Sequence, residues 1–305
     1  MRRARDTLLI LTLAAGPLVA GDRAFVTCQN GEVLSVIDVA TGEAQTWPLP
    51  GKPAGVAVAP DGRVYTVSAN SKEVRRMSPS GAVEAVTTLD GGPIGVALDA
   101  ARGRLFVSDW YNARIWVLDA ADLSVLQDLP TGAAPAGLAL SPDGRVLASA
   151  DKDADQVSLF DAETLNFMGR EPVGTRPFGL RFAPDGRLFV GNVGSNDVTV
   201  LGDDKTTVPV GERPYGIAFA HGRAFVTNQY ANTVSVIDLT TLTPLKTIDV
   251  GEYPEGIDTT SDGNIAVANW FDNTLSVIDA ETLEVIAVHD TGDGPRAFGT
   301  FLWGG

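Results

Sequence analysis

Hydrophobic and polar positions along the chain alternate in short runs and show no helical period. Apolar, β-branched stretches of four to seven residues are separated by turns rich in Gly, Asp and Pro. This pattern recurs seven times, over residues 23–62, 63–103, 104–144, 145–186, 187–222, 223–263 and 264–305. The period is close to 41 residues, with one shorter unit of 36. A period of about 40 to 45 residues that holds several short strands predicts the blades of a β-propeller.

Each unit contains four predicted strands, which we name A to D. In residues 214–250, strand A covers 214–220, B covers 223–227, C covers 233–238 and D covers 244–250. Pro-Asp-Gly at 60–62, 142–144 and 184–186 marks the A–B turn, because Pro presets the first turn residue and Gly accepts a positive φ. The C–D turn begins with an Asp that can cap backbone N–H groups, and these residues are Asp38, Asp119, Asp161, Asp238 and Asp279.

The two ends of the chain complement each other. Residues 23–49 supply strands B, C and D without an A strand, and residues 295–301 supply one extra A strand. We therefore predict an all-β, seven-bladed β-propeller whose ring is closed by the C-terminal A strand pairing with the N-terminal B, C and D strands. Residues 21–305 would form this single domain.

Residues 1–20 have the features of a secretory signal peptide, with Arg2, Arg3 and Arg5 before an apolar stretch that ends near Ala20. Cleavage there predicts a periplasmic or secreted protein without membrane insertion; an uncleaved anchor is the alternative. Without these residues the formal net charge changes from −15 to −17, which disfavours nucleic acids and anionic membranes. The single Cys28 excludes an intrachain disulfide. We align it with Ser68, Asp109, Ala150, Asn192, Asn228 and Asn269.

The segment 225–238, with the sequence FVTNQYANTVSVID, is echoed at 106–119 and 266–279. It resembles the YVTN family of β-propeller repeats, and the resemblance covers all seven units. Proteins similar to it are secreted or periplasmic propellers. They include surface proteins, YncE-type proteins that bind single-stranded DNA, and small propellers encoded beside quinoprotein (PQQ) dehydrogenases and their transporters. The resemblance implies the architecture and leaves the function open.

The repeats differ most around the proline that opens each A strand and in the nearby B–C loops. Cations and aromatic rings gather there, which predicts a binding site for a partner protein or a small anionic ligand at the mouth of the central channel. The alternative is that the Arg residues pair with Glu212, Glu252 and Glu255 and the rings cover the ring's upper layer. The candidate residues are Lys52, Trp110, Tyr111, Arg176, Phe178, Arg213, Tyr215, Tyr230, Tyr253, Glu255, Trp270, Phe271 and Arg296.

Signals for a metal or cofactor are weak. Asp151, Asp153 and Asp155 have the spacing of a calcium loop, but Gln156 replaces the usual Gly and no acid follows at the bidentate position. A solvated acidic loop is therefore the favoured interpretation. We expect the only two histidines to lie apart, His221 in an A–B turn and His289 at the end of a D strand. This disfavours a histidine metal site and a Ser-His-acid triad.

Together these observations favour a non-enzymatic binding propeller without a cofactor. The resemblance alone implies a role as an accessory to a quinoprotein or transport system. One alternative is a lactonase-like hydrolase, which would use carboxylates and Arg at the channel mouth but has no well-placed histidine base. The other is a single-stranded nucleic-acid-binding protein, which the strongly acidic charge argues against.

Overall fold

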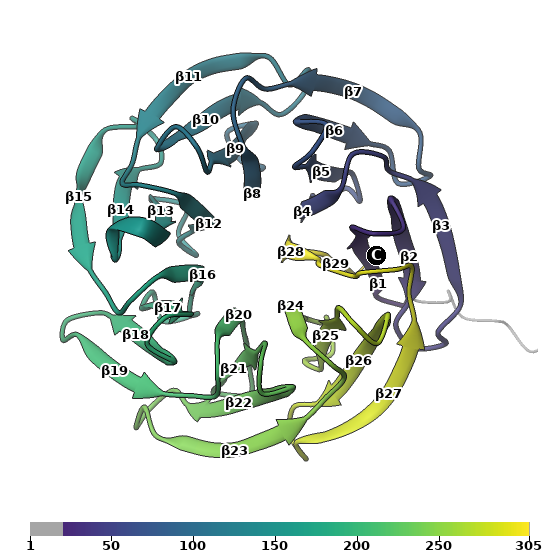
Figure 1. Ribbon diagram of the computed structural model, residues 1–305, viewed down its shortest axis with the longest axis vertical. Coiled ribbons are helices and arrows are strands. Elements are labelled where there is room, and N and C mark those ends of the chain that lie inside the picture. Colours follow the sequence, from purple (N-terminus) through teal and green to yellow (C-terminus); the bar gives the residue numbers. More distant parts are fainter. Residues whose placement is uncertain (1–20, 305) are drawn as a thin grey trace, which may run out of the picture.

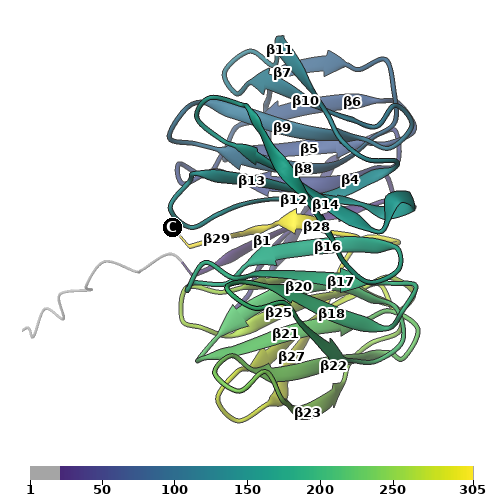
Figure 2. The same cartoon turned by 90° about the vertical axis from the view of Figure 1, so that its left-hand side faces the viewer.

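The computed structural model describes residues 21–304, which form seven four-stranded antiparallel blades around a central channel (Figures 1 and 2). The signal-peptide prediction concerns residues outside this range. The seven-bladed propeller is confirmed. Within residues 21–304, no helix has both the length and the apolar character needed to cross a membrane.

The blades are offset by one strand from the predicted units, because each unit supplies strands B, C and D of one blade and strand A of the next. Strand A lies at the channel and strand D at the rim (Figure 1). Blade 1 consists of β29 (Leu302–Trp303), β1 (Arg23–Cys28), β2 (Val33–Asp38) and β3 (Ala44–Pro48); blade 2 of β4 (Pro53–Val58), β5 (Val64–Ser68), β6 (Glu73–Met77) and β7 (Val83–Thr88); blade 3 of β8 (Pro93–Asp99), β9 (Arg104–Asp109), β10 (Arg114–Asp119) and β11 (Val125–Pro130).

The second half of the ring repeats this arrangement. Blade 4 consists of β12 (Pro135–Leu140), β13 (Val146–Asp151), β14 (Gln156–Asp161) and β15 (Phe167–Pro172); blade 5 of β16 (Pro177–Phe182), β17 (Leu188–Asn192), β18 (Asp197–Leu201) and β19 (Thr206–Pro209); blade 6 of β20 (Pro214–Ala220), β21 (Arg223–Asn228), β22 (Thr233–Asp238) and β23 (Pro244–Asp249); blade 7 of β24 (Pro254–Thr259), β25 (Ile265–Asn269), β26 (Thr274–Asp279) and β27 (Glu284–Asp290). A 3-10 turn, η1 (Lys152–Ala154), interrupts the B–C loop of blade 4.

The last residue of each B strand holds its blade together from within. Asn228 donates from Nδ2 to Ser235 Oγ on the adjacent C strand at 2.9 Å, and Asn269 does the same to Ser276 at 2.9 Å. In blade 4 this position is Asp151, which pairs with Pro135 at the start of the A strand. The sequence alignment of Ala150 with Cys28 was therefore wrong by one residue. The cause is that β13 has six residues like β1 but begins at Val146, one residue after the Arg145 at which the repeat was aligned.

The predicted caps of the C–D turns are confirmed. Asp238 Oδ1 accepts the backbone N–H groups of Thr240 at 2.9 Å and Thr241 at 2.7 Å. The hydrogen bond from the Thr241 backbone holds the pKa of this carboxyl below its ordinary value. The same arrangement recurs at the other turns, at Asp38, Asp119, Asp161 and Asp279.

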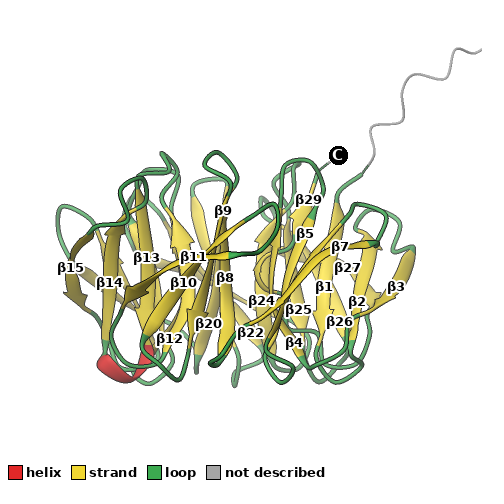
Figure 3. Cartoon of the chain, turned by 90° about the horizontal axis from the view of Figure 1, so that it is seen from above, coloured by secondary structure: helices red, strands yellow, loops and turns green. Residues whose placement is uncertain are grey.

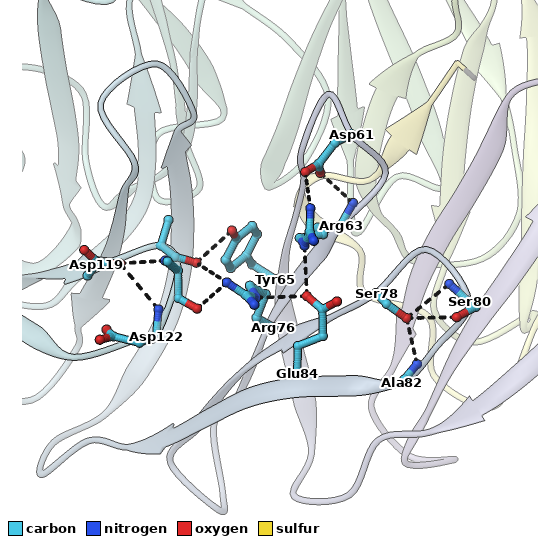
Figure 4. A network of polar contacts seen from close by, with 12 residues as sticks. Asp61, Arg63, Tyr65, Arg76, Ser78, Ser80, Ala82, Glu84, Asp119 and Asp122 are labelled. Carbon is cyan, nitrogen blue, oxygen red and sulfur yellow. Dashed lines mark hydrogen bonds and ion pairs between the residues drawn. The ribbon is translucent and has the colours of Figure 1, made fainter.

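Side chains of one blade also hold the C–D turn of the next blade. Arg104 Nη1 donates to the Ala162 carbonyl at 2.9 Å. Between blades 2 and 3, Tyr65 Oη donates to the Ala120 carbonyl at 2.9 Å, and Arg76 reaches the same turn (Figure 4). These contacts join neighbouring blades through hydrogen bonds in addition to the apolar core.

The C-terminal segment closes the ring as predicted, but in two pieces. Pro295 forms a bridge with Cys28, and β29 pairs with the start of β1 through Leu302 and Ala24. Between them β28 (Phe298–Thr300) leaves blade 1 and lies parallel beside β4 of blade 2 (Figure 1).

The replacement of a glycine by Ala297 explains why β28 leaves blade 1. The other A strands have Gly two residues after the proline, because the backbone of the neighbouring A strand passes close to it. A Cβ at Gly179 would lie 1.8 Å from the Tyr215 carbonyl oxygen, and one at Gly95 would lie 2.1 Å from that of Ala136. Ala297 occupies this position in the last strand, so its methyl group prevents the regular approach and the chain moves inward.

Candidate functional site

The residue before six of the seven A-strand prolines has a left-handed backbone. The φ angle is +60° at Lys52, +55° at Arg176 and Arg213, and +61° at Tyr253. The carbonyl oxygen of this residue accepts a hydrogen bond from a backbone N–H group of the neighbouring B–C loop. The Arg213 carbonyl, for example, accepts one from Gln229 N at 3.0 Å. The D–A and B–C loops therefore share one face, which we call the B–C face. It carries η1 and lies opposite the C-terminus (Figure 3).

Four predicted site residues form one continuous stack on the B–C face of blades 6 and 7. The Arg213 guanidinium lies 4.4 Å from the centroid of the Tyr230 ring and donates to its hydroxyl at 2.9 Å. Tyr230 and Tyr253 have ring centroids 5.5 Å apart, and Tyr253 and Phe271 are 4.9 Å apart. Tyr230 is 50% exposed and Phe271 is 59% exposed. We call Arg213, Tyr230, Tyr253 and Phe271 the aromatic ladder.

The middle of the ladder, Tyr253, is half-buried. Burial, with the hydrogen bond to Tyr230, raises the pKa of Tyr253 to about 12. Its hydroxyl is therefore neutral at physiological pH. The ladder presents rings and one guanidinium to the solvent, a combination enriched at the energetic centres of protein interfaces.

Two other predicted rings lie inside the molecule. Phe178 and Tyr215 are buried, with ring centroids 4.5 Å apart, and both contact Phe298 of the closing segment. Trp110 completes this group, with its ring centroid 5.9 Å from Phe178. Because these rings come from blades 3, 5 and 6 and from the closing segment, they plug the channel at the B–C face. Phe178 and Tyr215 are therefore not part of the exposed surface of this face.

Glu255 and Arg296 form a buried ion pair beside the plug. Arg296 Nε donates to Glu255 Oε2 at 2.8 Å and Nη2 donates to the Tyr215 hydroxyl at 3.0 Å, while the guanidinium stacks on Trp270 at 4.9 Å. Gln229 donates to Glu255 at 2.6 Å. Burial raises the pKa of Glu255, and the adjacent guanidinium opposes this shift. Burial lowers the pKa of Arg296, but Glu255 and Tyr215 together raise it by more, so the guanidinium stays charged.

The remaining predicted cations have acidic neighbours. Lys52 lies 3.7 Å from Glu32, and Arg176 lies 3.9 Å from Asp153 with more than half of its side chain exposed. Tyr111 is 76% exposed on blade 3, away from the ladder. Of the ion pairs that the alternative named, only one with Glu255 forms, through Arg296. Arg176 lies near Asp153 instead, and Arg213 contacts Tyr230.

The acidic loop of blade 4 does not gather its three carboxylates. Asp151 is buried and accepts Ser158 Oγ at 2.6 Å and Gly132 N at 2.8 Å. Asp155 is exposed and caps the backbone N–H of Arg176 at 2.7 Å. Across residues 21–304, no three His, Cys, Asp or Glu side chains group closely enough to hold a metal ion.

The channel contains a cavity of about 320 Å³ that sequence reasoning missed. It is lined by the middle and far ends of the A strands and by β28. Arg181 on β16 lines this cavity and reaches Asp258 on β24, with Nη2 donating to Oδ1 at 2.6 Å. The signal was present in the sequence. The fifth residue of the A strands is Ala57, Ala97, Ala139 and Ala218 in four blades, and only Arg181 and Asp258 carry charge there.

Comparison with known families supports the architecture. The family described as "Lactonase, 7-bladed beta-propeller" matches residues 111–219, and the NHL repeat matches residues 91–118. Each covers less than half of the chain. No curated protein matches.

Solved structures share the fold at low identity. A catalytically inactive histidine-to-alanine variant of virginiamycin B lyase from Staphylococcus aureus, with quinupristin, is 17% identical with a TM-score of 0.70, over 83% of this chain and 93% of that one. Hydrazine synthase of Kuenenia stuttgartiensis is 17% identical with a TM-score of 0.74, over 89% and 99%. A functionally unknown protein of Desulfotomaculum acetoxidans is 16% identical with a TM-score of 0.76, over 91% and 99%. This chain is a seven-bladed β-propeller repeat protein.

Proposed function

We propose that this protein is a non-enzymatic binding propeller, periplasmic or secreted, that captures a partner protein through the aromatic ladder. The single observation that carries the proposal is the exposure of Tyr230 and Phe271 in one stack with Arg213. Large exposed rings on a rigid scaffold are unusual for a surface without a partner, and Tyr and Arg dominate the binding energy of protein interfaces.

The structure favours a protein over a small anionic ligand. Arg296 is neutralised by Glu255, and Lys52 and Arg176 each lie within 4.0 Å of a carboxylate. A small anion would have to compete with these acids for Lys52, Arg176 and Arg296, and the remaining cation, Arg213, stacks on Tyr230. A protein interface needs no free cation, because ring burial supplies the energy.

The test uses Tyr230→Ala combined with Phe271→Ala, and Tyr111→Ala as a matched control that removes an exposed ring elsewhere on the same face. Each purified protein is used to capture partners from the native periplasmic or secreted fraction, with mass-spectrometric identification. We expect the wild type and the control to retain the same protein and the double variant to lose it at unchanged melting temperature. Equal capture by the double variant would refute the proposal.

A second candidate function is a lactonase-like hydrolase, which the family match over residues 111–219 supports. The variant of virginiamycin B lyase is described as catalytically inactive after loss of one histidine. In this chain His221 lies beside Glu281 at 3.4 Å and His289 beside the Val39 carbonyl at 2.9 Å, both away from the channel. Turnover of glucono-lactone by the full chain, above the spontaneous rate and lost in Glu255→Gln, would favour the hydrolase.

A further inference from the structure

The cavity in the channel is closed at one end and accessible from the other. The aromatic plug of Phe178, Tyr215 and Phe298 occupies the end at the B–C face. The lining at the opposite end includes Leu140 and Phe182, which are half-buried and lie where the A strands enter the A–B turns. A volume of about 320 Å³ falls within the range of small-molecule sites.

Arg181 brings unused hydrogen-bond donors to this cavity, whose lining is partly apolar and also includes Glu255 and Thr300. Its guanidinium has five N–H groups. Within residues 21–304, Nη2 donates to Asp258, and Nη1 makes two long contacts to the carbonyls of Ile217 at 3.4 Å and Ile257 at 3.5 Å. These contacts occupy at most three donors, so at least two are available to a ligand.

Asp258 does not depend on Arg181 alone. Its carboxylate also accepts the backbone N–H groups of Thr259 at 3.0 Å, Phe301 at 2.8 Å and Leu302 at 3.1 Å. The ion pair is therefore neutral and anchored to the closing segment. A second carboxylate in the cavity would leave one negative charge without a partner in a low-dielectric surrounding, which is costly.

We infer that this cavity is a binding site for a small uncharged molecule, mainly apolar, with a carbonyl or amide oxygen that accepts hydrogen bonds from Arg181. The apolar part of the ligand contacts the Leu, Val and Ile side chains of the A strands, and the polar end lies against the guanidinium. This site is entered from the A–B face and is independent of the aromatic ladder. If the cavity does not bind such a molecule, the proposed binding of a partner protein by the aromatic ladder is unaffected.

The test compares hexanamide with hexanoate, which have the same chain and differ in charge, by calorimetric or ligand-detected NMR titration of the full protein. Arg181→Met keeps the length of the side chain and removes its donors. Leu140→Trp narrows the entrance without altering the ion pair, and Leu245→Trp, on the exposed outer strand β23, is its matched control.

We expect saturable binding of hexanamide in roughly the millimolar range, and hexanoate to bind about tenfold more weakly. Arg181→Met and Leu140→Trp should each weaken hexanamide binding by about tenfold or more, and Leu245→Trp should not. If Arg181→Met does not fold, Leu140→Trp decides the question. Unchanged affinity in Leu140→Trp, equal affinity for hexanoate, or no saturable binding of hexanamide up to about 50 mM would each overturn the inference.

Discussion

Shortening the chain after Gly294 should abolish cooperative folding of the whole ring. The removed residues include β28 and β29, which contact blades 1 and 2 and also bind Asp258 of blade 7. Their loss opens the first blade and exposes the inner edge of β1. An exposed edge of this kind is avoided in natural sheets because it pairs with other chains.

The size of this effect follows from two buried rings and one carboxylate. Phe298 is 7% exposed and Phe301 is fully buried, and removal of each ring costs about 3–5 kcal/mol. Asp258 would lose two backbone donors, which adds about 1–3 kcal/mol. The total of about 7–13 kcal/mol is comparable with the free energy of unfolding of an entire domain, about 5–15 kcal/mol.

Urea and thermal denaturation, followed by circular dichroism, measure this directly. Phe301→Ala gives a graded version and should lower the free energy of unfolding by about 3–5 kcal/mol. Phe271→Ala, at an exposed ring of similar size, should change it by less than about 0.5 kcal/mol. If the chain of residues 1–294 melted at the full-length temperature, or if the two substitutions had equal effects, the closure mechanism would be refuted.

Three further predictions concern single residues. Burial raises the pKa of the Cys28 thiol, so it should resist iodoacetamide in the native protein and react fully in urea, which mass spectrometry can follow. Folding lowers the pKa of Asp238, so the charged carboxylate stabilises the protein above its ordinary pKa of 3.8, and this stabilisation is lost as the pH falls below it. The difference in the free energy of unfolding between wild type and Asp238→Ala should therefore shrink as the pH falls from 5 to about 2.5. Arg104→Met should cost about 1–2 kcal/mol in urea denaturation through the lost bond to Ala162, and the exposed Arg145→Met should cost almost nothing.

The repeat pattern predicted the architecture because each turn and strand is specified locally. The Pro-Asp-Gly and C–D turn signals depend on residues within five positions of one another, and the caps appear where they were expected, as at Asp238. Ring closure was also predictable, since a missing strand at one end and a surplus strand at the other leave one solution. The inward shift of β28 was not anticipated, because it follows from crowding by a backbone distant in sequence.

The candidate site was harder to predict because the burial of a side chain depends on whether it faces the interior of the propeller or the solvent. Residues on either side of one proline have opposite environments: Arg213 lies on the B–C face, and Tyr215 lies inside the plug. The sequence lists both as site candidates. The pairing of Arg181 with Asp258 spans two blades, and no local spacing reveals it, although both residues interrupt a column of alanines.

The contact between the two ends of the chain has a consequence for how the protein folds. The hydrogen bond from Ala297 N to Thr27 Oγ1 joins residues separated by 270 positions. Individual blades can form from local contacts. However, β1 of blade 1 and β4 of blade 2 pair with β29 and β28 only when the last ten residues are in place. Contacts of such large sequence separation slow folding, because the loop must close before any energy is gained. An incomplete chain therefore keeps an unpaired edge until its final residues are added.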